Sequence, residues 1–270
     1  MSKKTKKETI LCFSSQRWRD EMWTNKQHIM SRLASEHQVI HVDYGLRPLP
    51  QYLSARARWL PRERWPPHRL FIVGVAKEGG DLHIGDSYSP LWAGLFRHGS
   101  KPRDFFTFDA KVLMAKRFLK RENIKPIVWV YHPGFADAVD HVDRKLLVYD
   151  CVDNYEAFPT YRDDPGWLMA REERLCRKAD LVFCTRPALY ESRRKFNPEN
   201  TYLVHNVGDA EHFERAMAPE TVVPPEIAQL KGPVIGFVGA VSDYKLNIQW
   251  IQDAAKAQPA WNFVLIGPVG

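Results

Sequence analysis

Short apolar runs alternate with longer stretches of helical spacing along most of this chain, and this rhythm limits what it can fold into. Each run is four to six residues long and apolar on both faces, which is typical of strands covered by helices on both sides. The alternation predicts an α/β fold with a mainly parallel sheet. The expected strands are 9–13, 38–43, 70–75, 126–131, 145–149, 181–185, 201–204, 234–238 and 263–266.

The stretches between these runs predict helices, because their apolar residues recur every three to four positions. Pro165 suits the first turn of its helix, where the fixed backbone angle of proline is tolerated. No apolar run approaches the roughly 18 residues of a membrane span, and the mean hydropathy is −0.41. The expected helices are 19–36, 110–122, 165–178, 187–196 and 246–257.

Two proline-rich stretches organise the chain into domains. Residues 44–69 hold five prolines and interrupt the alternation, so we interpret them as an insertion within a first domain at 9–215. Residues 216–233 are interpreted as a linker. Residues 234–270 then begin a second βαβ unit that is too short to bury a core alone. We expect a basic tail at 1–8, a Rossmann-like N-terminal domain, and the incomplete beginning of a second Rossmann-like domain.

Basic residues are concentrated in two places, although the net charge of the whole chain is +7. Residues 1–8 hold four lysines and one glutamate, and residues 44–69 hold six arginines, two tryptophans and one glutamate. Nucleic-acid-binding proteins usually spread basic residues over a whole face, so we do not expect a nucleic acid partner. One interpretation of residues 44–69 is a solvated loop that packs its tryptophans on the body. The other is contact with an anionic membrane surface or a lipid phosphate.

The four cysteines, at positions 12, 151, 176 and 184, are scattered and form no CxxC pair. We interpret them as reduced core residues of a cytoplasmic protein, not as disulfides or zinc ligands. The basic start lacks the apolar segment of a secretory signal. The signatures of dinucleotide oxidoreductases, P-loop NTPases, zincins and serine hydrolases do not occur either.

Polar side chains follow the first expected strand. Open α/β sheets bind ligands at the carboxyl ends of their strands, so such positions are candidate sites. Ser14, Ser15, Arg17 and Trp18 follow the run 9–13, and hydroxyls beside an arginine suit a ligand that carries hydroxyls or phosphate. The alternative is a helix N-cap by Ser14 or Ser15 with a solvated Arg17.

Two further strand ends carry titratable groups. His132 precedes a Pro-Gly turn and suits a general base or ligand-orienting role, although a lone histidine is more often structural. Asp150 and Asp153 follow the run 145–149; one suits a cap, and the other a proton acceptor or a partner of sugar hydroxyls. Their DxxD pattern differs from the DxD of metal-dependent nucleotide-sugar enzymes, so we expect no metal site.

The beginning of the second domain has a glycine-rich strand end. Gly236 and Gly239 lie in and after the run 234–238, and Lys245 precedes a helix. Glycines let backbone N–H groups approach a phosphate, and a helix N-terminus favours an anion. The pattern by itself is common in α/β proteins.

Four segments, taken in order, resemble one enzyme family. They are EERL at 172–175 with ADLVFCT at 179–185, HNVGD at 205–209 with Phe213, GPVIGFVG at 232–239 with Lys245, and WNFVLIG at 261–267. These segments resemble the helix, strands, domain junction and phosphate loop of the retaining, family-four-like (group 1) glycosyltransferases with the GT-B fold. The resemblance covers residues 125–270 well and 1–45 loosely. It is greatest to the branch that acts in bacterial cell-surface and exopolysaccharide assembly, including teichuronic-acid-type enzymes.

The resemblance implies transfer of a sugar from a nucleotide-sugar donor to a glycan or lipid-linked acceptor, with no cofactor and no obligatory metal. It implies that Gly239, Lys245 and Gly267 bind the donor, and that His132 and Asp153 are catalytic residues near the reacting sugar. It places Ser14, Ser15, Arg17 and Trp18 on the acceptor side. Fixed positive charge and helix N-termini would then stabilise the departing diphosphate.

The sequence departs from the family pattern in the first loop, which has Ser14-Ser15 in place of glycines, and after the donor strand, where Gly239-Ala240 replaces Gly-Arg. The order of residues 206–209 (NVGD) is also transposed. The family's acidic E-x7-E segment would lie beyond Gly270, so we expect the 270-residue chain alone to be inactive. A nucleotide-sugar epimerase, a non-catalytic binding or scaffold protein, and a nucleic-acid binder are the alternative functions.

Overall fold

In the computed structural model, the described residues are 7–16, 18, 23–42, 47–48, 73–78, 82–89, 115–116, 119–161 and 165–270. Contacts group the chain into two compact units, Met1–Asn206 and Val207–Gly270. The sequence placed the end of the first domain at 215, and the structure groups residues 207–215 with the second unit. Most of the basic tail and of the 44–69 segment lies outside the described residues.

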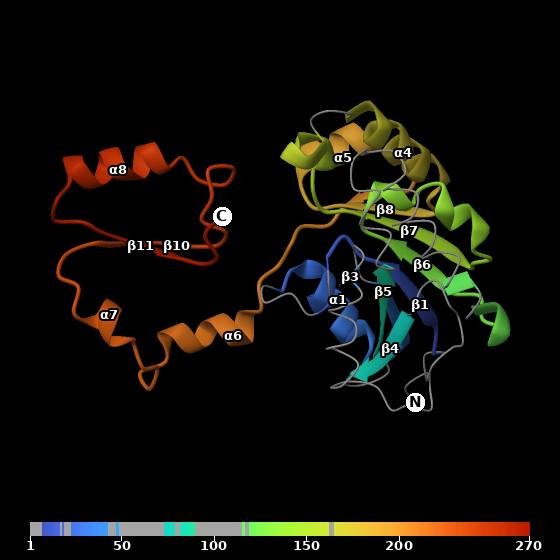
Figure 1. Cartoon of the computed structure of the whole chain (residues 1–270), viewed down its shortest axis with the longest axis horizontal. Helices are drawn as coiled ribbons and strands as arrows, with labels where there is room; N and C mark the ends of the chain where they lie inside the picture. Colours follow the sequence, from blue (N-terminus) through green and yellow to red (C-terminus); the bar gives the residue numbers. More distant parts are fainter. Residues whose placement is uncertain are drawn as a thin grey trace. The chain divides into compact units, whose positions relative to one another are not determined.

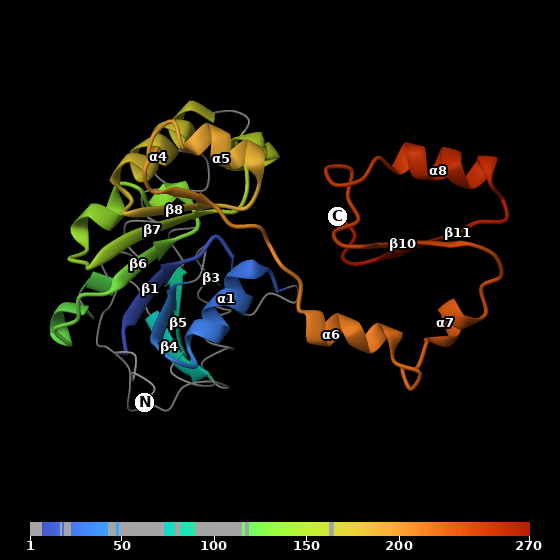
Figure 2. The same cartoon turned by 180° about the vertical axis from the view of Figure 1, so that it is seen from behind.

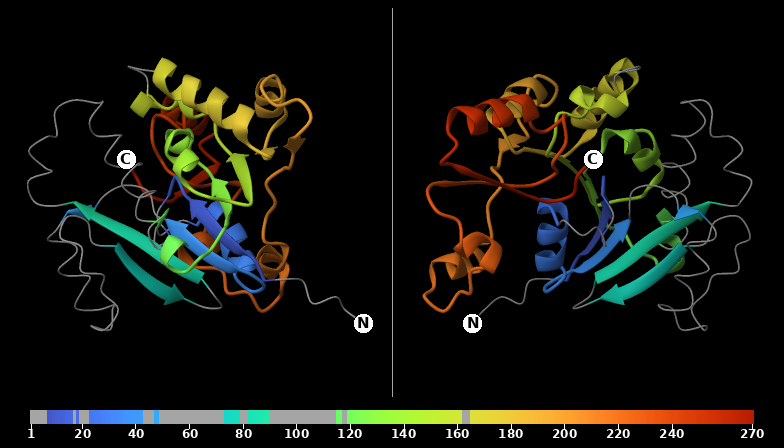
Figure 3. Two further views of the ribbon diagram at one scale, coloured as in Figure 1. Left: turned by 90° about the vertical axis from the view of Figure 1, so that its right-hand side faces the viewer. Right: turned by 60° about the vertical axis from the view of Figure 1, so that its left-hand side comes forward.

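The first unit is built on one sheet, to which the described residues contribute nine strands in the order β3-β5-β2-β1-β6-β7-β8-β9, with β4 beside β5 (Figure 1). Every neighbouring pair is parallel except β4 and β5, which Figure 3 shows from two further sides. The strands are β1 (Thr9–Phe13), β2 (Gln38–Val42), β3 (Arg47–Pro48), β4 (Val73–Glu78), β5 (Leu82–Ser89), β6 (Ile127–Val130), β7 (Leu146–Cys151), β8 (Leu181–Cys184) and β9 (Thr201–Leu203).

Helices cover both faces of this sheet. Alternate residues of β1 point to opposite faces and are buried in two different clusters. Ile10 and Cys12 belong to one buried cluster with Met30 of α1, and Leu11 and Phe13 belong to another with residues of α4 and α5. α1 packs against β2, and Figure 2 shows α4 and α5 beside β7 and β8. The helices are α1 (Asn25–Leu33), α4 (Pro165–Lys178) and α5 (Pro187–Arg193); short 3-10 turns span Pro133–Phe135, Ala138–His141, Tyr155–Ala157 and Pro159–Tyr161.

The second unit contains a single parallel strand pair. β10 (Val234–Val238) pairs with β11 (Asn262–Ile266), and α8 (Ile248–Ala257) connects them. The shorter α6 (Ala210–Glu214), a 3-10 turn at Arg215–Met217 and α7 (Pro225–Ala228) precede β10. Its apolar side chains are exposed, with Val238 at 76% and Trp250 at 74%. A lone βαβ unit buries little apolar surface, as expected for so few residues.

The predicted α/β fold with a parallel sheet agrees with the structure, and most predicted strands lie within one or two residues of the observed ones. The prediction for 19–36 was wrong at its start, because Thr24 caps a helix that begins at Asn25. In the prediction for 70–75, residues 73–75 belong to β4, and residues 70–72 lie outside the described part of the chain; β5 was missed. Across the parts of the chain that the structure describes, we find no helix both long and apolar enough to span a membrane.

Candidate functional site

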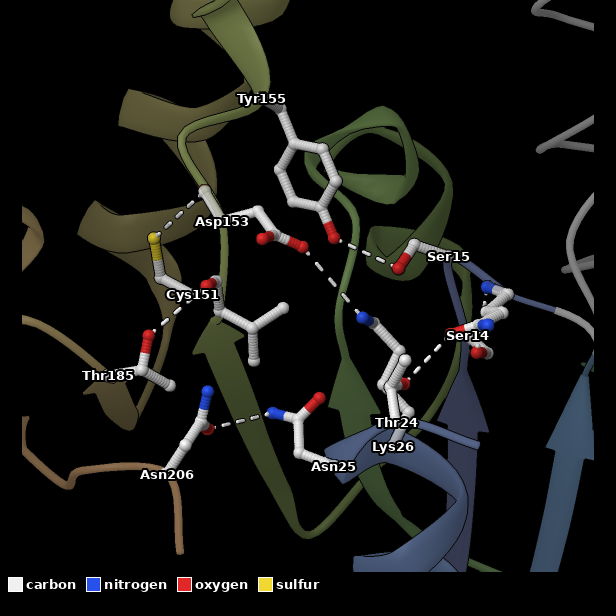
Figure 4. A network of polar contacts seen from close by, with 12 residues as sticks. Ser14, Ser15, Thr24, Asn25, Lys26, Cys151, Asp153, Tyr155, Thr185 and Asn206 are labelled. Carbon is white, nitrogen blue, oxygen red and sulfur yellow. Dashed lines mark hydrogen bonds and ion pairs between the residues drawn. The ribbon is translucent and has the colours of Figure 1, made fainter. Parts of the chain in front are cut away.

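The candidate site of the first unit lies where its parallel strands end. Ser14 and Ser15 follow β1, Asp153 follows β7 and Thr185 follows β8. Parallel strands carry these loops to one edge of the sheet, where α/β proteins bind their ligands. Figure 4 shows the side chains from these loops converging on the first turn of α1.

The two serines are held differently. Ser14 is buried; its N–H donates to the Val42 carbonyl at 3.1 Å, and its Oγ accepts from the Gln16 N–H at 3.0 Å. Its hydroxyl therefore closes a local turn. It does not cap α1, the alternative considered from the sequence, because the N-cap of α1 is Thr24. Ser15 is half-buried, and its Oγ accepts a hydrogen bond of 2.9 Å from the Tyr155 hydroxyl. This contact joins the loop after β1 to the loop after β7.

The start of α1 is fixed on several sides. The Thr24 N–H donates to the Gln27 side chain at 3.0 Å, one half of a capping box, and the Thr24 hydroxyl donates to the Gln16 side chain at 2.8 Å. Asn25 donates to the Asn206 side chain at 3.3 Å. The backbone of the first turn is therefore set by residues from the β1 loop and from the segment after β9.

Lys26 is the charged side chain that this turn directs into the site (Figure 4). Its side chain is 6% exposed, and its Nζ lies 3.9 Å from Oδ2 of Asp153, whose side chain is 43% exposed. Burial lowers the pKa of Lys26, and the charges of Asp153 and Asp150 oppose that shift. The site thus combines one buried cation with one carboxylate that solvent reaches.

Asp150, the other carboxylate of the DxxD pair, is buried at the end of β7. Burial raises its pKa to about 6, although a hydrogen bond of 3.2 Å from the Trp129 indole and the charge of Lys26 both favour the ionised form. Asp150 and Asp153 therefore divide into a buried carboxylate and a half-exposed one. The cap and ligand-contacting roles considered from the sequence stay predictions.

His132 is buried and caps the 3-10 turn that follows β6. Its Nδ1 accepts from the Gly134 N–H at 3.0 Å, and its Nε2 lies 2.8 Å from the Tyr161 hydroxyl. Burial and the charge of Lys26 lower its pKa to about 3, so the ring is neutral. Because Nδ1 accepts, Nε2 carries the proton and donates to Tyr161. In this state both ring nitrogens are engaged, and a base role stays a prediction.

A second buried network holds the loop after β7 from the helix side. Arg193 of α5 binds both oxygens of Glu172 of α4, at 3.1 and 2.7 Å, and reaches the Asn154 side chain at 3.2 Å. The Tyr149 hydroxyl donates to the same carboxylate at 2.5 Å. Burial lowers the pKa of Arg193, but the charge of Glu172 outweighs this and raises it overall. This network fixes Asn154, the residue next to Asp153.

The remaining acceptor-side candidates fall elsewhere. Arg17 lies outside the described residues. Trp18 is 3% exposed and packs with Trp23 and His41, at ring distances of 5.1 Å each. It belongs to the buried cluster on the α1 side of the sheet. Its indole therefore supports that face of the core.

In the second unit, the structure brings Gly239 and Gly267 together at the carboxyl ends of β10 and β11. Both have positive φ, 158° for Gly239 and 146° for Gly267. A Cβ on Gly267 would lie 1.8 Å from the Gly239 carbonyl oxygen, so only glycine fits there. The Gly239 N–H donates to the Ile266 carbonyl at 2.9 Å, which holds the two loops side by side.

Along the chain, Lys245 lies between Gly239 and α8. It is exposed, and its Nζ lies 4.6 Å from the centre of the Tyr244 ring. α8 begins after Asn247, whose side chain accepts from the Trp250 N–H at 3.1 Å. Glycine backbone, a lysine and the N-cap of a helix therefore follow one another within nine residues, 239–247. Phosphate binding at this segment stays a prediction from the sequence.

Sequence reasoning missed Lys26 and the role of Arg193. The signal for Lys26 was present in Thr24-x-x-Gln27, a capping-box pattern that places residue 26 in a first helical turn directly after the β1 loop. Starting the helix at residue 19 hid it within the helix interior. Arg193 carried no signal, because its partner Glu172 is 21 residues away and on another helix.

Within the described residues, no three or more histidine, cysteine, aspartate or glutamate side chains gather as a metal site would require. All four cysteines are buried, and none of them forms a disulfide. Whether the reaction needs a metal stays a prediction from the sequence.

The chain is similar to one curated glycosyltransferase. It is 26% identical over 148 residues to the "putative teichuronic acid biosynthesis glycosyltransferase TuaH" of Bacillus subtilis (strain 168), which covers 52% of this chain and 37% of that protein. No family model matches the sequence. The chain thus spans well under half of the length of this relative.

Solved structures show the fold. An α,α-trehalose-phosphate synthase (UDP-forming) of Burkholderia xenovorans, in complex with glucose-6-phosphate, matches with a TM-score of 0.59 and 11% identity over 97% of this chain and 66% of that one. The corresponding enzyme of Burkholderia vietnamiensis matches with a TM-score of 0.57 and 10% identity over 98% of this chain and 64% of that one. These neighbours are GT-B glycosyltransferases, so the chain has the GT-B-like α/β fold that its sequence predicted.

Proposed function

We propose that this protein is a glycosyltransferase of bacterial polysaccharide biosynthesis that moves a sugar from a nucleotide-sugar donor to a glycan or lipid-linked acceptor. The observation that carries the proposal is the sequence similarity to a teichuronic acid glycosyltransferase over 148 residues. The likeness to UDP-forming synthases supports it, because those enzymes share this fold.

The proposed roles follow the two units. In the first unit, Asp153 and Ser15 face the acceptor from the carboxyl edge of the sheet, Ser14 and Trp18 shape that side, and His132 orients the loop between them. Arg17 is proposed for the same side from its place in the sequence. Hydroxyl, amide and carboxylate groups at this edge suit the hydroxyls of a sugar.

In the second unit, Gly239, Gly267 and Lys245 are proposed to bind the donor diphosphate. Neither glycine of the pair has a side chain of its own, and the ring of Phe237 lies close to where a Cβ of Gly239 would be. Lys245 and the start of α8 supply positive charge, which stabilises a leaving diphosphate without a metal. No cofactor is needed, because the nucleotide sugar is itself the activated substrate.

A peripheral association with the inner face of the cell membrane, and a role at the cell envelope, belong to the same proposal. Residues 1–8 and 44–69 carry most of the surplus positive charge. Each basic side chain near an anionic surface contributes about 1 kcal/mol, so a cluster of six arginines supports reversible docking. Sedimentation with phosphatidylglycerol vesicles should capture the protein, whereas phosphatidylcholine vesicles should not.

The experiment that tests the function uses protein purified from its native cells and a panel of UDP-, GDP- and dTDP-sugars. Transfer of labelled sugar to cell-envelope glycans, with release of nucleoside diphosphate, is the expected result. The variant Lys245→Ala should raise the donor KM by about tenfold, the effect of one lost charged phosphate contact. Lys256→Ala, in the last turn of α8, is the matched control and should not change it.

Three other results would replace the proposal. Donor interconversion without any acceptor would identify an epimerase. Glycan or lipid binding with neither donor binding nor turnover would identify a binding or scaffold protein. Tight, strongly salt-dependent association with nucleic acid would revive the nucleic-acid alternative.

A further inference from the structure

Lys26 stands in a place that disfavours a cation for three separate reasons. Its side chain is 6% exposed, and burying an ammonium group costs free energy unless close partners replace its water. It is the second residue of α1, and the positive end of a helix dipole disfavours a lysine in the first turn. Its ion-pair partner, Asp153, lies 3.9 Å away.

The distance between Nζ and Oδ2 is too long for a direct hydrogen bond, which has a donor–acceptor distance of about 2.8 Å. The pair therefore offsets little of the desolvation of the lysine. By contrast, Arg193 makes two hydrogen bonds to Glu172 at 2.7 and 3.1 Å. A buried lysine with so poor a pair is typical of a group retained for function.

One hydroxyl oxygen placed beside the pair can contact both charged groups. Two hydrogen bonds of about 2.8 Å that together span the 3.9 Å between Nζ and Oδ2 meet at an angle of roughly 90° at the bridging oxygen. A hydroxyl oxygen would accept from the Lys26 ammonium and donate its proton to the Asp153 carboxylate. It would reach the pair from the side of Asp153, whose side chain is 43% exposed.

We propose that Lys26 and Asp153 together bind one hydroxyl group of a sugar, and that Lys26 is a ligand-binding residue. The inference rests on the proposed function in taking a sugar as the ligand. Ser15 and Tyr155 flank the pair in Figure 4. Their mutual hydrogen bond of 2.9 Å holds the loops on either side of it in register. The first turn of α1, fixed through Thr24 and Asn25, fixes the lysine backbone.

The test measures sugar binding and stability of the same variants in the 270-residue chain. Saturation-transfer NMR with methyl α-D-glucopyranoside, methyl α-D-galactopyranoside and methyl N-acetyl-β-D-glucosaminide measures binding, and thermal unfolding measures stability. The variants are Lys26→Met, which keeps the length of the side chain, and Asp153→Asn. The matched controls are Lys125→Met and Asp143→Asn, which break an exposed pair at 2.9 Å.

The proposal expects at least one glycoside to bind the wild-type chain, and both site variants to weaken it by about tenfold or more, as loss of a charge-assisted hydrogen bond does. Lys26→Met should unfold at the same temperature as the wild-type chain or higher, because methionine fills the site without a buried charge. Both controls should bind as the wild type does.

Three results would overturn the proposal. They are unchanged binding in either site variant, no glycoside binding by the wild-type chain, and a Lys26→Met chain that unfolds at a clearly lower temperature. A lower unfolding temperature of Lys26→Met would show that the lysine stabilises the fold. In that case the Asp153→Asn variant, which changes only a half-exposed side chain, would still measure the contribution of the pair to binding. Failure of the proposed function is separate: it would appear as absence of sugar transfer by the native protein, whatever the glycosides do.

Discussion

Among the described residues of the first unit, Lys26 and Arg193 are two buried cations, and they are bound in opposite ways. Arg193 binds both oxygens of Glu172, whose carboxylate also accepts from Tyr149, and all three side chains are buried. Lys26 faces Asp153 across 3.9 Å, and that carboxylate is half-exposed. The first arrangement satisfies its charges within the protein, and the second leaves one of its two charged groups in reach of solvent.

The two arrangements meet at the loop after β7. Arg193 holds Asn154 at 3.2 Å from the helix side, and Lys26 faces the neighbouring Asp153 from the α1 side. A rigid network therefore supports the residue next to one that has freedom to bind. A precise binding site requires this division between residues that contact the ligand and residues that support them. Each prediction below changes a group in or beside one of the two arrangements.

Replacing Arg193 by methionine should have the largest effect on stability. It leaves the Glu172 carboxylate buried without a cation, which costs about 3–5 kcal/mol of unfolding free energy. Urea unfolding of the 270-residue chain measures this. Arg194→Met is the control; its exposed pair with Glu191 lies at 3.7 Å, and its loss should cost less than about 0.5 kcal/mol. Equal effects of the two variants would show that the Arg193 network does not carry the stability assigned to it.

Asp150 should make the stability of the first unit fall with rising pH. Its folded pKa of about 6 exceeds the unfolded value of 3.8, so the folded state binds more protons between these limits. The stability due to protonated Asp150 is therefore fully present below the unfolded pKa and is lost as the pH rises through 6. Over that window the loss reaches up to about 3 kcal/mol.

The measurement compares urea unfolding of the wild type and Asp150→Asn between pH 3.5 and pH 7. As the pH rises, the unfolding free energy of the wild type should fall relative to that of the Asp150→Asn variant, because asparagine does not titrate. Asp143→Asn, whose side chain is 72% exposed, serves as the control and should follow the wild type. A flat difference between wild type and Asp150→Asn would contradict the raised pKa.

Tyr149→Phe tests the buried network around Glu172 with a smaller change than Arg193→Met. It removes one of the donors to Glu172 and keeps the ring packing, so we expect a loss of about 2 kcal/mol, typical of a hydrogen bond to a charged group. Combined with Arg193→Met, it should show a non-additive loss, because both residues act on one carboxylate. Additive losses in a double-mutant cycle would mean that the two contacts are independent.

The sequence predicted the sheet of this protein well, for a physical reason. Strands such as β1 and β7 are buried along most of their length on both faces, so each is visible in the sequence as one mainly apolar run. β5 escaped because LHIGDSYS mixes polar and apolar residues, as expected where it pairs with an antiparallel strand near the sheet's edge. Helix starts were less certain, since the first turn of α1 depends on a cap rather than on periodicity.

The candidate site could be predicted only by position. Strand ends directed attention to Ser15, His132 and Asp153, and the structure brings Ser15 and Asp153 onto one edge. Their partners could not be derived in the same way. Tyr155 lies 140 residues from Ser15, and Lys26 lies 127 residues from Asp153, so only the folded sheet joins them. His132 was correctly placed at a strand end, but its engaged ring nitrogens depend on Gly134 and Tyr161, which only coordinates show.

Ser15→Ala should have the smallest of these effects, and it sharpens the comparison from the binding side. The Tyr155 residue is 3% exposed, so removing the Ser15 oxygen leaves its hydroxyl without that acceptor and costs about 1 kcal/mol. Ser31→Ala, which removes only a hydroxyl bonded to its own helix at 3.1 Å, is the matched control and should cost less than about 0.5 kcal/mol.

In the double variant Ser15→Ala/Tyr155→Phe both hydroxyls are gone and no buried polar group is left without a partner, so most of the lost unfolding free energy should be recovered. The opposite result would be a double variant whose loss of unfolding free energy equals the sum of the losses in the two single variants. The serine and the tyrosine would then contribute through packing, and this hydrogen bond would not be what holds the loops beside Lys26 and Asp153.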